Sequence, residues 1–137
     1  LRSVSGDFAI ETKVSDGENG SKLGGLVVWH SEHNYIRFET LSNTATYYGD
    51  TVYMGTCLAD RFIHPGVHSF EADEVWLRLE RKGDRFTGYT SADGSSWYRC
   101  GWVDIPMEDP IQVGIHALCR WPPATSTMFG HFRIYSP

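Results

Sequence analysis

Three short runs of the sequence carry ionisable side chains at alternate positions, so that a β-strand would present them on one face. Two carboxyl groups about 5–10 Å apart across a cleft are the requirement for glycoside hydrolysis. Glu39 and Glu80 form such a pair if their two runs adjoin in a sheet. Arg37 and Arg78 share the faces of these carboxylates, so we expect ion pairs here instead of catalysis. The ionisable residues are Arg37 and Glu39 in 34–41, Arg78 and Glu80 in 75–81, and His116 in 111–119.

The same residue types also suit the binding of sugar hydroxyl groups. Arg, Glu and His carry planar polar groups that hydrogen-bond hydroxyls in pairs, and exposed Trp and Tyr provide stacking surfaces. Trp29 lies in a run that is apolar on both sides, so we expect it in the core, whereas Tyr53 in a later run is a further candidate for the ligand face. The residues that we expect to bind a ligand are Tyr35, Arg37, Glu39, Tyr48, Trp76, Arg78, Glu80, His116 and Trp121.

Short alternating strands are the elements that must position these residues. Ile36 and Phe38 alternate with the polar side chains of their run, as Val113 and Ile115 do in a later one, and these apolar sets should pack between two sheets. About ten strands are too many for one open sheet in a chain of this length, so we expect two packed antiparallel sheets. The expected strands are 7–14, 22–30, 34–41, 44–49, 51–56, 67–71, 75–81, 85–91, 96–101, 111–119 and 128–135, and a turn is expected at 64–66.

The composition bounds the class of protein. A chain of 137 residues is expected to form one domain, 1–137, and to be monomeric. Its net charge of −5 argues against nucleic acid as a partner, and no apolar run approaches the ~20 residues of a membrane span. The chain does not begin with Met, so we expect a mature or excised fragment, secreted or extracellular, with a cytoplasmic location as the alternative. The cysteines Cys57, Cys100 and Cys119 match no zinc motif and leave one disulfide or three free thiols open.

Four segments in this order resemble a known superfamily: DFAIETKV (7–14), GGLVVWHSEHNYIRFE (24–39), VWLRLERKGDRFTGYTSADGSSW (75–97) and VGIHAL (113–118). They are similar to the concanavalin A-like lectin/glucanase superfamily. Within it, the closest resemblance is to the regulation-of-enolase-like family and to related modules attached to bacterial glycosidases. The likeness spans about 7–135 and implies a jelly-roll sandwich of two curved antiparallel sheets, often with a carbohydrate-binding role.

The resemblance also carries expectations for particular residues. Retaining glucanases of the superfamily place their acids as Glu-x-Asp-x-x-Glu on one strand, and the nearest string here, EADE at 71–74, lacks the last Glu. The turn at 91–97 resembles an Asp-box, which implies a structural role for Asp93 and Trp97. Sandwich lectin modules often hold a structural calcium ion with loop carboxylates and carbonyls. The loop acids available for calcium are Asp7, Asp16, Glu18, Asp104, Glu108 and Asp109.

The sequence therefore favours a non-catalytic carbohydrate-binding module of jelly-roll fold within a larger secreted enzyme. The alternative is a protein-interaction or regulatory domain of the same fold that binds no sugar. A small glycosidase is the third hypothesis, and the incomplete acid string argues against it.

Overall fold

All regular secondary structure in the computed structural model is β-strand, within the residues that the structure describes: 1–16, 23–41, 51–70, 74–117 and 127–137. No helix among these residues is long and apolar enough to cross a membrane. The strands are β1 (Arg2–Val4), β2 (Phe8–Asp16), β3 (Leu23–Ser31), β4 (Asn34–Leu41), β5 (Thr51–Leu58), β6 (Arg61–Ser69), β7 (Glu74–Lys82), β8 (Arg85–Ser91), β9 (Tyr98–Asp104), β10 (Ile111–Ala117) and β11 (Thr127–Tyr135).

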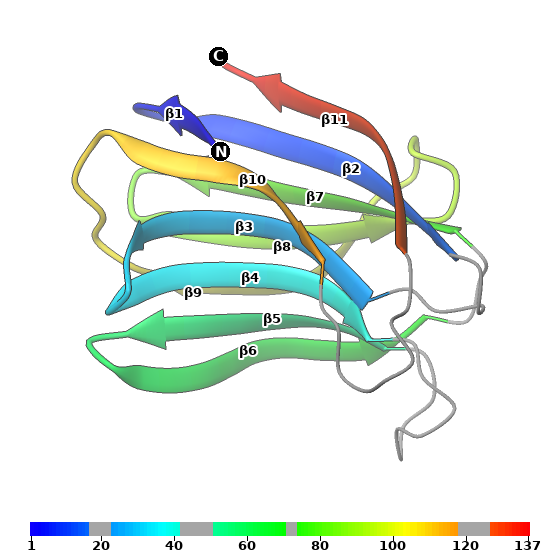
Figure 1. The fold of residues 1–137 in the computed structure, drawn as a ribbon, viewed down its shortest axis with the longest axis horizontal. Helices are drawn as coiled ribbons and strands as arrows, with labels where there is room; N and C mark the ends of the chain where they lie inside the picture. The colour runs from blue at the N-terminus through cyan, green and yellow to red at the C-terminus, as the bar shows by residue number, and fades with distance from the viewer. Residues whose placement is uncertain (17–22, 42–50, 71–73, 118–126) are drawn as a thin grey trace.

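The strands form two antiparallel sheets that are packed into a sandwich (Figure 1). The six-stranded sheet has the order β1-β10-β3-β4-β5-β6, and the five-stranded sheet has the order β11-β2-β7-β8-β9. The predicted all-β sandwich of two antiparallel sheets is confirmed. Both terminal strands, β1 and β11, lie at the same edge of the sandwich, each in a different sheet.

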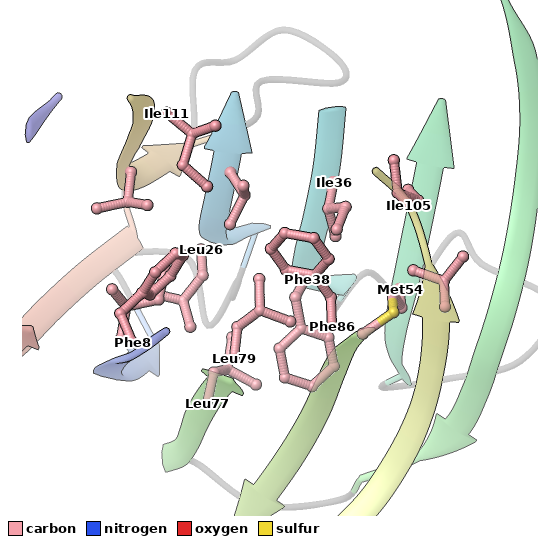
Figure 2. Packing of buried hydrophobic residues seen from close by; sticks show 14 of the residues in the cluster. Phe8, Leu26, Ile36, Phe38, Met54, Leu77, Leu79, Phe86, Ile105 and Ile111 are labelled. Atoms are coloured by element: carbon pink, nitrogen blue, oxygen red, sulfur yellow. The ribbon is translucent and has the colours of Figure 1, made fainter. Parts of the chain in front are cut away.

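The core consists of the apolar half of each alternating strand. Phe38 of the six-stranded sheet and Phe86 of the five-stranded sheet are fully buried and lie between the two layers (Figure 2). Truncating such a residue removes its transfer energy and leaves a cavity, so Phe38→Ala would cost about 3–5 kcal/mol. Ile115 was expected inside, but it is exposed. The reason is that β1 pairs with residues 111–113 alone, so β10 forms the edge of its sheet beyond Val113.

The region 58–69 differs from the sequence-based prediction. Its turn lies at Ala59 and Asp60, which both have positive φ (49° and 65°), and the predicted turn at 64–66 lies inside β6. Two-residue hairpin turns with two positive φ values are usually marked by Asn-Gly or Asp-Gly, so Ala-Asp gave little signal. Pro65 is tolerated because β6 is an edge strand. The predicted strand at 44–49 lies outside the described residues.

One end of the sandwich is fastened by the buried side chain of Arg81. Its guanidinium donates hydrogen bonds to the carbonyl oxygens of Gly83 (3.0 Å), Gly6 (3.3 Å) and Met107 (2.7 Å) and to Oδ1 of Asp109 (2.6 Å). Hydrogen bonds from Arg81 and from the Gly6 amide hold the pKa of Asp109 below its usual value. One side chain thus joins the segment before β2, the β7–β8 turn and the segment between β9 and β10.

Candidate functional site

The structure divides the predicted ligand residues between two surfaces. β4 and β10 flank β3 in the six-stranded sheet, so Tyr35, Arg37, Glu39 and His116 share its outer face. β7 belongs to the other sheet, so the expectation that its polar side chains adjoin those of β4 is wrong. Alternation determines which side chains of a strand share a face, but it does not determine which strands are neighbours. The residues on β7 are Trp76, Arg78 and Glu80, and Tyr48 and Trp121 lie outside the described residues.

A fully buried carboxylate, Glu39, is the centre of the polar cluster on the six-stranded sheet. The hydroxyl of Tyr53 donates a hydrogen bond to its Oε1, and Arg37 Nε lies 3.9 Å from the same oxygen. Its Oε2 lies 2.9 Å from Nε2 of His116. A buried carboxylate is costly unless it is paired, so these three neighbours are what makes the position tolerable.

The register of β3 explains how His116 reaches Glu39 across an intervening strand. Gly25 pairs with Glu39 on one side and with His116 on the other. Two strands on either side of a third are almost 10 Å apart, which two long side chains span only if nothing stands between them. An added Cβ on Gly25 would lie 2.2 Å from the carbonyl oxygen of Phe38 and 2.9 Å from Cδ1 of the core residue Leu77. The close approach of β3 to its neighbour and to the core therefore requires glycine at this crossing.

The cluster contains polar atoms that lack hydrogen-bond partners. Among the described residues, four buried side-chain nitrogen or oxygen atoms have none, and three of them are Arg37 Nε, Glu39 Oε2 and His116 Nε2. The contact between Glu39 and His116 is short enough for electrostatic attraction, but its angles do not make a hydrogen bond. Native proteins satisfy more than nine in ten buried polar groups, so three atoms without hydrogen bonds at one place distinguish this cluster from an ordinary packed surface.

Aromatic side chains lie on the same face beyond Arg37, in the row of residues that contains Tyr35. Trp29 stacks on Tyr35 across β3 and β4, with ring centroids 5.2 Å apart and planes inclined by 17°. The Arg37 guanidinium lies 5.5 Å from the ring centroid of Phe62 on β6, which also contacts His64. Gly55, the partner of Arg37 on β5, leaves space for the rings of Tyr53 and Phe62.

Two of these aromatic side chains lie where the sequence-based prediction did not place them. Trp29 was expected in the core, but it is 37% exposed on the outer face, because Leu26 and Val28 supply the inward-facing positions of β3. Phe62, 44% exposed, was missed together with His64, because 64–66 was interpreted as a turn.

The corresponding surface of the five-stranded sheet is a closed ion-pair network. Arg78 forms an ion pair with Glu11 on β2 and donates a hydrogen bond to Oε2 of Glu80 at 3.2 Å. The sequence predicted ion pairs for Arg78. Tyr135 donates a hydrogen bond to the second oxygen of Glu11 at 3.2 Å. Burial lowers the pKa of Arg78, but the hydrogen bonds with both glutamates outweigh it and the net pKa is raised. Glu39 and Glu80 lie on opposite outer faces of the sandwich, so they are not a catalytic pair.

Three of the loop acids considered for calcium have other partners, and the calcium site stays a prediction. Asp104 forms a two-point ion pair with Arg85, Asp109 is paired with Arg81, and Asp7 accepts the amide of Gly83. Within the described ranges, no three His, Cys, Asp or Glu residues gather as metal ligands.

The turn at 91–97 has the hydrogen bonds expected of an Asp-box. Asp93 Oδ1 accepts the amides of Ser95 (2.8 Å) and Ser96 (2.9 Å), and these bonds lower the pKa of Asp93. Gly94 packs against the ring of Trp76, since an added Cβ would lie 3.0 Å from Trp76 Cε2. The turn therefore covers β7.

The thiols that the structure describes are free. Cys57 is buried, and burial raises the pKa of Cys100 to about 11, so Cys100 is not a reactive thiolate near neutral pH. Cys119 lies outside the described residues.

Several solved structures share the fold of this chain. The GH43 BlXynB protein from Bacillus licheniformis has a TM-score of 0.80 at 16% identity over 96% of this chain, which spans 28% of that protein. The carbohydrate binding module CBM66 from Bacillus subtilis has a TM-score of 0.59 at 16% identity, covering 96% of this chain and 76% of that one. Toad ovary galectin in complex with thio-digalactose has a TM-score of 0.56 at 12% identity, covering 93% and 92%.

These likenesses show the concanavalin A-like or galectin-like sandwich fold. A family model described as "Protein of unknown function (DUF1349)" matches residues 1–136. No curated protein sequence matches the chain. The narrower resemblance to the regulation-of-enolase-like family is not confirmed and stays a prediction.

Proposed function

The chain belongs to the DUF1349 family, and we propose that it is a non-catalytic carbohydrate-binding domain. Its binding surface is the outer face of the six-stranded sheet around Glu39. The observation that carries the proposal is the polar cluster of Arg37, Glu39 and His116, which lies on the same face as the exposed aromatic side chains of Trp29 and Phe62. Planar polar groups that converge beside aromatic surfaces are the features of a saccharide site.

Each residue has a distinct part in this site. Glu39 is buried and acts as the positioning residue, because it orients Arg37, Tyr53 and His116 without facing the ligand itself. Arg37 has a side chain that is 31% exposed, and its guanidinium donates hydrogen bonds to sugar hydroxyl oxygens. Trp29 and Phe62 contact the apolar faces of the sugar rings on the same face as the cluster.

The comparisons support the same class of ligand. One structural neighbour is named a carbohydrate binding module and another was crystallised with thio-digalactose. A binding role is favoured over hydrolysis because Glu39 and Glu80, the two carboxylates considered for catalysis, lie on opposite faces. Since the chain spans 28% of the GH43 protein that it resembles, we place it as an accessory domain of a larger secreted enzyme.

A glycan array tests the proposal, with Arg37→Gln as the site variant. Arg85→Gln is the matched control, because Arg85 also pairs with a carboxylate and lies 4.0 Å from the centroid of an aromatic ring, that of Trp102, but on the other sheet. We expect the wild type and Arg85→Gln to bind the same glycans and Arg37→Gln to lose them while its circular dichroism spectrum is unchanged. Parallel arrays in calcium and in EDTA are expected to agree.

A folded wild-type protein that binds no glycan refutes the proposal and favours the protein-interaction alternative. Binding that survives in Arg37→Gln shows that the site lies elsewhere.

A further inference from the structure

The outer face of the five-stranded sheet carries a second groove, of about 610 Å³, which is separate from the Glu39 cluster. Its volume is within the range of small-molecule sites. It lies over the ends of β2, β7 and β11, where Lys13 on β2 pairs with Gly130 and with Trp76 on either side. The groove is lined by Lys13, Ser15, Glu74, Met128, Phe129, Gly130 and His131.

His131 adopts a backbone conformation that favours glycine. It lies in a β-bulge of β11, where the register shifts between Gly130 and Arg133, and its φ is +55°. Glycine usually occupies a left-handed bulge position, and bulges re-aim side chains next to binding sites. Non-glycine residues in this region persist when the surrounding structure compensates for the strain.

The strained backbone aims the imidazole of His131 across β2 onto Trp76. The two rings are stacked, with centroids 5.4 Å apart and planes inclined by 28°. Gly130 has no side chain above Lys13, so the path across the sheet is open, and Lys13 Nζ lies 5.9 Å from the centroid of the same indole. Gly94, in the turn at 91–97, packs against the ring of Trp76. The bulge therefore builds an aromatic stack at the groove.

The polar lining indicates a neutral ligand. Lys13 Nζ lies 3.7 Å from Oε1 of Glu74, so the groove offers no uncompensated cation to an anion. Lys13 and Ser15 supply hydrogen-bond donors, while Glu74 and the Ser15 hydroxyl supply acceptors. Met128 adds an apolar wall that is 64% exposed. We propose that this groove is a second saccharide site, in which a neutral sugar ring packs against His131, whose own ring is stacked on Trp76.

This second site does not depend on the Glu39 surface, and NMR can follow sugar binding at each of the two sites separately. The ¹⁵N-labelled domain is titrated with xylohexaose, cellohexaose and thio-digalactose while the indole resonances of Trp29 and Trp76 are followed. We expect at least one sugar to move the Trp76 signal with its own saturation curve, and Arg37→Gln to leave that curve unchanged. A Trp76 signal that none of these sugars moves overturns the second site, whatever Trp29 does.

Two substitutions of His131 separate its ring from its backbone. His131→Gly should keep or raise the melting temperature, because glycine adopts the left-handed conformation without strain. His131→Asn also tolerates that conformation and removes the ring. Both variants should weaken binding at Trp76 by about two- to tenfold, the contribution of one aromatic contact. Unchanged affinity at Trp76 in both folded variants overturns the proposal.

Discussion

Replacing Arg81 with Gln removes the side chain that joins three connecting segments at one end of the sandwich. The side chain of Arg81 is 7% exposed and donates four hydrogen bonds, one of them to the carboxylate of Asp109. Breaking a buried, hydrogen-bonded charge pair costs about 3–5 kcal/mol. We take the lower end, about 3 kcal/mol, because water can reach the Asp109 carboxylate, whose side chain is 39% exposed.

Thermal unfolding measures this effect directly. A chain of this length has an unfolding entropy of about 290 cal/mol/K near its midpoint, so a loss of 3 kcal/mol lowers the melting temperature by about 10 °C. Arg85→Gln is the control, because Arg85 makes a two-point ion pair on the same hairpin but has a side chain that is 53% exposed. Exposed ion pairs contribute little, so its melting temperature should hardly change. Equal decreases in melting temperature in the two variants would refute the inference that the buried Arg81 contributes more to stability than the exposed Arg85.

Three further predictions concern single residues. Glu39→Gln keeps the shape but removes the buried charge that orients Arg37, so we expect a loss of about 1–3 kcal/mol in unfolding free energy and weaker glycan binding; wild-type values for both would contradict the positioning role. The hydrogen bond that protonated His33 donates to the Asp60 carboxylate raises the pKa of His33. The stabilisation from this pair is therefore complete below about pH 6.5 and is lost as the pH rises through the higher folded-state pKa. His33→Asn should therefore lower the melting temperature in acid but not in alkali, and an equal loss at both ends of a pH series counts against this. Because the pKa of Asp93 is lowered in the folded protein, its ionised carboxylate stabilises the fold at pH values above the unfolded-state pKa. This stabilisation is lost as the pH falls through the folded-state pKa. Asp93→Ala should therefore lower stability near neutral pH while the folded protein still binds glycans, and lost binding without lost stability would disprove a structural role.

Local periodicity predicted the faces of β4 and β7 correctly. Ile36 and Phe38 point inward while Arg37 and Glu39 point outward, because a period of two residues is a property of the strand alone. Which sheet a strand joins depends on contacts between distant segments, and this information is absent from alternation. Arg78 was therefore assigned to the face of Arg37 when it lies on the other side of the molecule.

The remaining errors have local causes. The run around Trp29 has apolar residues on both faces, so its composition did not reveal that Leu26 and Val28 point inward and Trp29 outward. The bulge at His131 has no sequence mark except the preceding Gly130, because His occupies a position where glycine is usual. Sites formed by an exception to a local rule are the hardest to recognise from a single sequence.

The glycine at the crossing of β3 predicts that three positions vary together among members of the family. Gly25, Glu39 and His116 come from different strands but are paired in one row of the sheet, and an added Cβ on Gly25 would collide with the backbone of the strand that carries Glu39. A larger residue at Gly25 would therefore disturb the contact between Glu39 and His116. Within the family, the three positions should therefore be retained or lost as a unit, which separates members that keep the Glu39 surface from those that use the same sandwich for other purposes.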